Sequence, residues 1–247
     1  MSADNKKHKN NLIYRGIKKG NPLGTGLFLG LRSLDPVLQY GILAKDLAAG
    51  AIHKLGGQTL ASGPPVITNT PLDRLAISPY RLILLAMAAG SAIKQNYWLV
   101  GISEEEFPPL SAVEVSVFNT VFNSINSVLF TCSLTSASVN GEHFPQTPLI
   151  VGSALYTVGI LTEGISEWQR KQFKKDSANK GKVYQGGLFS LARHINYTGY
   201  TLWRAGYALA AGGWTWGALV GSFFFWNFST SGMYFAQALL GSTGVCF

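Results

Sequence analysis

The stretch "TLWRAGYALAAGGWTWGALVGSFFFW", residues 201–226, is predominantly apolar and holds one charged side chain, Arg204. A helix needs about 20 mostly apolar residues to cross the roughly 30 Å hydrocarbon core of a bilayer. Extended to residue 228, the stretch exceeds that length. It therefore predicts a membrane-spanning helix, and the rest of the chain can be examined for partners of the same kind.

The composition agrees with a membrane protein. Only 13% of the 247 residues are charged and 47% are hydrophobic, whereas a typical soluble domain has about a quarter charged residues. Three further apolar stretches cover residues 75–102, 110–134 and 147–165, and a weaker one covers 24–52. Together they predict an all-α fold, a polytopic transmembrane helical bundle with about 5–7 spans.

The weaker stretch carries Arg32 and Asp35, which are unfavourable in lipid unless they pair or face the protein interior. Their i,i+3 spacing on a helix predicts that they pair with each other. Pro36 follows directly and predicts a break or kink.

Basic residues flank the predicted spans and suggest an orientation. The net charge is +8, and the cations concentrate before residue 20 and at 170–182. Such clusters suit cytosolic loops beside anionic lipid better than a nucleic-acid surface. Four spans between the clusters place both on the cytosolic side. We expect an integral membrane protein that has a cytosolic N-terminus, contacts membrane lipids and binds no nucleic acid.

The same features divide the chain into four regions. We expect a basic cytosolic tail over residues 1–22 and a four-span membrane region over 23–166. A basic loop with a motif region follows over 167–230, and an atypical, uncharged tail over 231–247.

Polar and small residues inside the spans allow two interpretations. Asn119, Asn123 and Asn126 fall on one helix face, where they could form interhelical hydrogen bonds or line a polar substrate cavity. Pairs of small residues, such as Gly217 and Gly221, let helices approach closely.

Metal binding and cysteine redox chemistry find no support in the sequence. The two cysteines form no paired motif, and the four histidines are far apart, so we expect no metal site and no disulfide framework. The glycine spacing of "GTGLFLG", residues 24–30, does not fit a dinucleotide fingerprint, and no βαβ context surrounds it.

One polar segment remains, "GGLFSLARHINYTGY", residues 186–200. Arg193 offers a planar guanidinium suited to phosphate or carboxylate, and His194 exchanges protons near neutral pH. Asn196, Tyr197 and Tyr200 add hydrogen-bonding groups. With Lys180 and Lys182, the segment predicts either a cradle for an anionic cofactor or a juxtamembrane loop whose cations meet lipid phosphates.

The run "GLFSLARHINYTGYTLW" resembles the signature of the steroid 5-alpha-reductase C-terminal family, which includes the DUF1295 membrane proteins, and is most similar to fungal members with an RHINY-type motif. The upstream "SEWQRKQFKKDSANKGK" is similar to the stretch that precedes that signature. Ile195 and Tyr200 stand where the family has Pro and Glu.

The resemblance implies a protein of the endoplasmic reticulum or another endomembrane. It implies a reductase that uses NADPH to reduce a C=C bond in a steroid, sterol or other lipid. It places the cofactor near residues that match the R-H-x-N-Y pattern and the upstream stretch, namely Arg193, His194, Asn196, Tyr197, Gln169, Lys174 and Asn179.

Two alternatives stay open beside the reductase. Isoprenylcysteine- or phospholipid-methyltransferase-like enzymes share a compact membrane architecture and a related motif, but they use S-adenosylmethionine. A catalytically inert membrane protein that retains the fold is the other alternative. The candidates for the proton-transferring catalytic group are Tyr197, Tyr200 and His194, and the expected substrate is a lipophilic small molecule.

Overall fold

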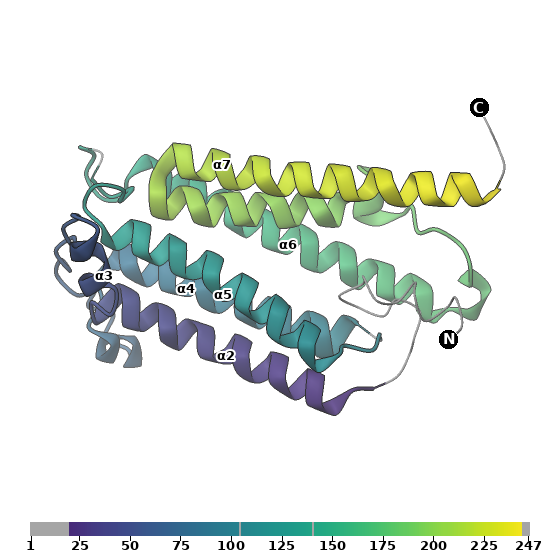
Figure 1. The fold of residues 1–247 in the computed structure, drawn as a ribbon, viewed down its shortest axis with the longest axis horizontal. Coiled ribbons are helices and arrows are strands. Elements are labelled where there is room, and N and C mark those ends of the chain that lie inside the picture. The colour runs from purple at the N-terminus through teal and green to yellow at the C-terminus, as the bar shows by residue number, and fades with distance from the viewer. Residues whose placement is uncertain (1–19, 104, 140, 244–247) are drawn as a thin grey trace. The chain divides into compact units, whose positions relative to one another are not determined.

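The computed structural model describes residues 20–103, 105–139 and 141–243, and this part of the chain is helical without a named strand (Figure 1). The all-α prediction is therefore confirmed for the described residues. The helices are α2 (Pro22–Ala44), α3 (Ala49–Lys54), η1 (Pro71–Leu75), α4 (Pro79–Tyr97), the π-helical turn η2 (Trp98–Ile102), α5 (Pro109–Thr131), α6 (Thr147–Lys175), η3 (Ser177–Asn179), η4 (Gly187–Ser190) and α7 (Ile195–Thr243).

Proline marks the beginning of the long helices. Pro22, Pro79, Pro109 and Pro148 each occupy the first turn of a helix. There the missing N–H removes no helical hydrogen bond and the fixed φ is already helical. These starts explain why the predicted apolar stretches and the observed helices largely coincide.

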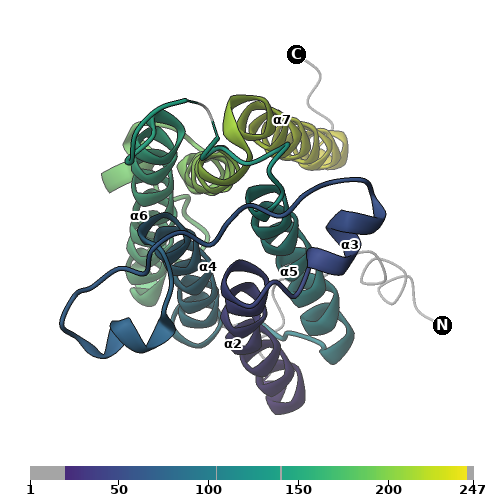
Figure 2. The same ribbon diagram turned by 90° about the vertical axis from the view of Figure 1, so that its left-hand side faces the viewer.

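The chain divides into two compact units, Met1–Phe144 and Pro145–Phe247. In the first unit α2 packs against both α4 and α5 (Figure 2). Helix α2 continues through Pro36, so the predicted break at that residue is absent. The four regions expected from the sequence follow charge and motif rather than compactness, and their boundaries stay predictions.

The second unit consists of α6, two short 3-10 turns and α7. Helix α7 is two antiparallel arms that reverse at Gly213, whose φ of 76° and ψ of −171° are non-helical (Figure 1). The Tyr197 ring stacks on Phe228 at 4.7 Å, and a Cβ on Gly221 would lie 3.2 Å from the Ala205 Cβ. The single span expected over residues 201–228 is thus a hairpin. Glycine at position 213 allows the reversal, because only glycine readily adopts this backbone conformation.

Helices α6 and α7 touch through four glycines spaced by seven residues on each helix. A Cβ on Gly152 would lie 2.6 Å from the Gly206 carbonyl oxygen, and one on Gly199 would lie 2.6 Å from the Glu163 nitrogen. A Cβ on Gly159 would lie 2.7 Å from the Gly199 carbonyl oxygen. No side chain fits between the backbones, so polar groups on the two helices reach one another directly.

By length and composition, two described helices could cross a bilayer, namely α6 and the Ile195–Thr230 part of α7. The predicted number of about 5–7 spans is not confirmed by this measure. Large apolar side chains on both helices are nevertheless exposed, among them Leu161, Phe225 and Trp226. Residues 244–247 of the expected tail lie outside the described part, and the α7 backbone runs to Thr243.

Candidate functional site

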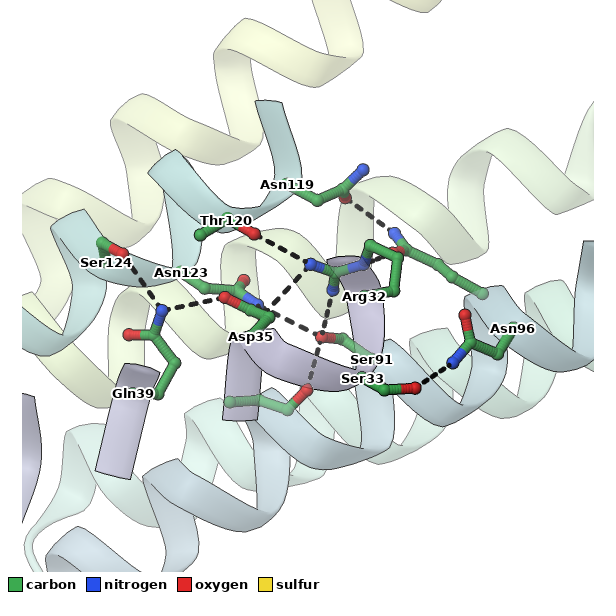
Figure 3. Close-up of polar contacts among 12 residues, drawn as sticks. Arg32, Ser33, Asp35, Gln39, Ser91, Asn96, Asn119, Thr120, Asn123 and Ser124 are labelled. Carbon is green, nitrogen blue, oxygen red and sulfur yellow. Dashed lines mark hydrogen bonds and ion pairs between the residues drawn. The ribbon is translucent and has the colours of Figure 1, made fainter. Parts of the chain in front are cut away.

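A buried polar network joins α2, α4 and α5 in the first unit (Figure 3). The Arg32 Nη1 lies 3.1 Å from the Asp35 Oδ2, and both side chains are 0% exposed. The predicted pairing is confirmed. The Arg32 Nε also donates to the Gln95 Oε1 at 2.6 Å, and the Asn123 Nδ2 donates to the Asp35 Oδ2 at 2.6 Å. The ion pair is therefore solvated by amides from two other helices.

The asparagine face of α5 faces this network. Asn119 accepts a hydrogen bond from the Gln95 Nε2 at 2.7 Å, and Asn123 bonds to α2 as described above. Gln39 extends the network, since its Nε2 donates to the Asp35 Oδ1 at 2.9 Å. Interhelical hydrogen bonding is confirmed for Asn119 and Asn123.

In the second unit, Asn196 joins α7 to α6. It is buried, and its Nδ2 donates to the Glu167 Oε1 at 2.7 Å. Arg170, one turn further along α6, forms an ion pair with the other oxygen of the same carboxylate. Asn196 thus fixes the first turn of α7 on a buried carboxylate, and this anchors the residues on either side of it.

His194 and Tyr197 form an aromatic stack beside that anchor. Their rings are 5.6 Å apart and 8° from parallel, and Tyr197 continues the stack onto Phe228 of the second α7 arm. His194 is exposed, but Tyr197 shields one face of its ring. Burial first, and then the charge of Arg193, lower the pKa of the imidazole from its ordinary 6.5. His194 is therefore neutral near pH 7 and can accept a proton.

Tyr200 lies one turn deeper and contacts a buried arginine. Its hydroxyl oxygen accepts from the Arg204 Nε at 3.2 Å and Nη2 at 3.1 Å. The Arg204 guanidinium also lies 4.3 Å from the centre of the Trp203 ring. The Trp203 indole N–H in turn donates to the Glu163 Oε2 at 2.7 Å. Aromatic rings therefore surround the Arg204 guanidinium, and Trp203 links them to the Glu163 carboxylate of α6.

The upstream candidates have other partners. The Gln169 Oε1 accepts from the Leu188 backbone N–H at 3.0 Å, and the Asn179 Nδ2 donates to the Phe173 carbonyl at 3.1 Å. Lys174 and Arg193 are exposed. Gln169 and Asn179 thus shape the loop between α6 and α7. His194 directly precedes α7, and Asn196, Tyr197 and Tyr200 lie on its first two turns.

Sequence reasoning missed Glu163, Glu167 and Arg204 as members of this site. A signal for them exists, because ionisable residues inside apolar helices are rare and commonly functional. Glu163 and Glu167 are spaced i,i+4 near the end of a predicted span, and Arg204 is the one charge of the opening stretch. No group of three or more His, Cys, Asp or Glu able to hold a metal occurs among the described residues.

The described residues thus form helices, two of which could span a membrane. Polar and aromatic side chains lie together at the start of α7. The chain belongs to the DUF1295 family, described as "Protein of unknown function (DUF1295)", which matches residues 108–233. The match includes α5, α6 and every motif residue named above. The wider steroid 5-alpha-reductase-like assignment stays a prediction.

A curated relative extends the likeness over most of the chain. The Probable O-methyltransferase ustE of Ustilaginoidea virens is 42% identical over 221 residues, which cover 88% of this chain and 78% of that protein. No solved structure matches the chain.

Proposed function

We propose that the protein is an S-adenosylmethionine-dependent O-methyltransferase, set in an endomembrane with its N-terminus in the cytosol and acting on a lipophilic acceptor. The observation that carries this proposal is the 42% identity, over 88% of the chain, to a relative named as a probable O-methyltransferase. The methyltransferase alternative drawn from the sequence thereby gains support, and NADPH gains none from that relative.

The side chains of the α7 site suit such a cofactor. When bound, S-adenosylmethionine supplies a methyl group on a positively charged sulfur. Aromatic rings attract cations, and Phe228 ends the stack that begins at His194 and continues through Tyr197. The Glu167 carboxylate, already paired with Arg170, holds Asn196 and so fixes the start of α7 beside these rings. Exposed Arg193 suits the carboxylate of the amino-acid part.

His194 is the group best suited to proton transfer. When a methyl group is added to a hydroxyl oxygen, the proton of that hydroxyl must leave. His194 is exposed, and its lowered pKa keeps the ring neutral at pH 7, so that it can take this proton. Tyr197 holds the imidazole plane from one side. Tyr200, held by Arg204, is a second polar group one turn away.

NADPH-dependent reduction of a C=C bond is the second candidate. It is favoured by the exposed cations around the motif, since Lys174, Lys180, Lys182 and Arg193 would suit the phosphates of that cofactor. The two candidates demand different ligands, so one binding experiment separates them.

The test measures the thermal unfolding of the full chain in detergent with S-adenosylmethionine, with NADPH and without ligand. A ligand at 100 times its dissociation constant stabilises the folded state by about 2.7 kcal/mol. We expect S-adenosylmethionine alone to give this stabilisation. Arg193→Ala should weaken it, whereas Arg74→Ala, at an exposed arginine of the other unit, should not.

Stabilisation by NADPH alone would replace the proposal with the reductase. If neither ligand has an effect, the site binds no such cofactor and the inert alternative holds. Activity is measured separately, as the transfer of label from S-adenosylmethionine to added acceptors. Lipophilic phenols or alcohols form the first panel of acceptors.

A further inference from the structure

The segment between α6 and α7 is strongly basic. Residues 174–193, which include the last two residues of α6 and are called the basic loop here, contain five exposed cationic side chains, namely Lys174, Lys175, Lys180, Lys182 and Arg193. The one acidic residue of the loop is Asp176, whose side chain accepts from the Ala178 backbone N–H at 2.9 Å and so caps η3. The cations therefore dominate the charge of this surface.

The basic loop has a packed inner side. Tyr184 lies between Phe173 and Phe189, with ring centres 4.9 Å and 5.7 Å apart. The outer side carries large apolar residues instead, since Val183 is 70% exposed and Leu191 is 75% exposed. Because aromatic residues already fill the inner side, Val183 and Leu191 are available to another apolar medium.

The loop also lies where the two candidate spans end. Helix α6 ends at Lys175 and α7 begins at Ile195, so both helices have their ends beside it. Trp168, on the last turns of α6, is 48% exposed. Tryptophan is enriched where membrane proteins meet the lipid headgroups, and lysine is enriched in the cytosolic loops beside them.

From these observations we infer that the basic loop docks on anionic phospholipid headgroups, with Val183 and Leu191 entering the interfacial layer. Exposed cations are attracted to an anionic leaflet, and each lysine near the surface adds to this attraction. A soluble phosphate would use the same cations but would gain nothing from the two apolar side chains between them. The alternation of cationic and apolar residues thus favours a lipid surface over a nucleotide.

The test titrates the full chain, in a neutral detergent, with short-chain phosphatidylserine, short-chain phosphatidylcholine and inorganic phosphate, followed by thermophoresis. Wild-type protein should bind phosphatidylserine at least about tenfold more tightly than phosphatidylcholine, and rising salt should weaken this preference. The variant K175Q/K180Q/K182Q should bind phosphatidylserine about 10- to 100-fold more weakly. The variant V183S/L191S should weaken binding of both lipids.

The matched control, K45Q/K54Q/R74Q, removes three exposed cations from the other unit and should bind phosphatidylserine as wild type does. Equal affinity for the two lipids, or an equal loss in the control, would overturn the inference. So would displacement of the lipid by millimolar inorganic phosphate, because the ligand would then be free phosphate. Binding of S-adenosylmethionine is measured separately, so this inference and the proposed function can fail independently.

Discussion

Arg32 and Asp35 show how a charge can be held inside an apolar bundle. Both are fully buried, and the amides of Gln95 and Asn123 complete their hydrogen bonding. Removing one partner leaves the other charge buried and uncompensated, which typically costs about 3–5 kcal/mol. Replacing both with apolar residues of similar volume avoids that penalty.

We therefore expect Arg32→Met and Asp35→Leu each to lower the free energy of unfolding by about 3–5 kcal/mol, and the double variant to lose less than the sum. Denaturant titration in detergent measures this, with Arg74→Met as an exposed control. Strictly additive losses would mean that the two side chains contribute independently.

The lowered pKa of His194 sets the sign of a pH effect. Because the folded state holds the ring below the ordinary pKa of 6.5, the unfolded chain takes up a proton first as the pH falls. Stability from this residue is thus full above pH 6.5 and is lost on acidification. Methyl transfer that uses the neutral ring should fall at lower pH, as the pH passes through the lowered pKa of His194 in the folded protein.

This pH effect is tested with His194→Gln, which cannot titrate. We expect the wild-type melting temperature to drop more than that of the variant between pH 7.5 and 5.5. The acid limb of the rate profile should disappear in the variant, together with most of the activity. Identical pH profiles would remove His194 from the proposed mechanism.

At this scale the sequence indicated candidate polar residues, but for most of them it did not indicate which groups they contact. The i,i+3 spacing was sufficient for Arg32 and Asp35, because both lie on one helix. The sequence did not indicate that Asn196 bonds to Glu167, which is 29 residues away along the chain, and the cofactor role expected of Asn196 stays a prediction. Contacts between helices depend on their rotation and offset, and a single sequence does not encode these locally.

Among the elements, α6 and α7 depend on glycine for their close approach. A Cβ on Gly206 would lie 2.5 Å from the Tyr156 backbone nitrogen, too close for any side chain. Gly206→Ala must therefore push the helices apart, at a typical overpacking penalty of about 1–3 kcal/mol. The movement would also lengthen the hydrogen bond between Glu163 and Trp203.

Gly164→Ala on α6 is the matched control, because a Cβ there meets nothing within 4 Å. Alanine at a helix interior favours folding by up to about 1 kcal/mol relative to glycine, so this variant should be as stable as wild type or more so. Equal destabilisation by both substitutions would mean that close packing at Gly206 is unimportant.

Helix positions were predictable from the sequence, because apolar length and an initial proline act locally. The reversal at Gly213 was not, since Gly212 and Gly213 lie inside an unbroken apolar run and the hydropathy of residues 201–228 suits one helix. The sequence does not distinguish a glycine within a helix from a glycine at which the chain reverses. The positive φ at Gly213 becomes necessary only because the second arm packs on the first.

At the scale of the whole molecule, the hairpin predicts two membrane passes for α7 where one continuous helix would give a single pass. The first arm, residues 195–212, is about 27 Å long at 1.5 Å per residue, close to the thickness of the hydrocarbon core. Two such arms return the chain to the side from which it entered. One continuous span would leave it on the opposite side.

Labelling distinguishes these topologies. In a background with Cys132→Ser and Cys246→Ser, we introduce Gln185→Cys in the basic loop or Ser229→Cys near Phe228. In sealed membrane vesicles, a membrane-impermeant maleimide should reach both sites from the same side. Reaction from opposite sides would contradict the hairpin in the membrane.

The four-glycine contact between α6 and α7 has a consequence for what changes in length the protein can accept. Each extra residue rotates the following part of a helix by about 100°. A one-residue insertion between Gly152 and Gly159 would keep every amino acid but turn one glycine out of the contact. It would also turn Gly152 and Glu163 to different sides of α6. This region should therefore accept many exchanges of exposed side chains while rejecting nearly every insertion or deletion.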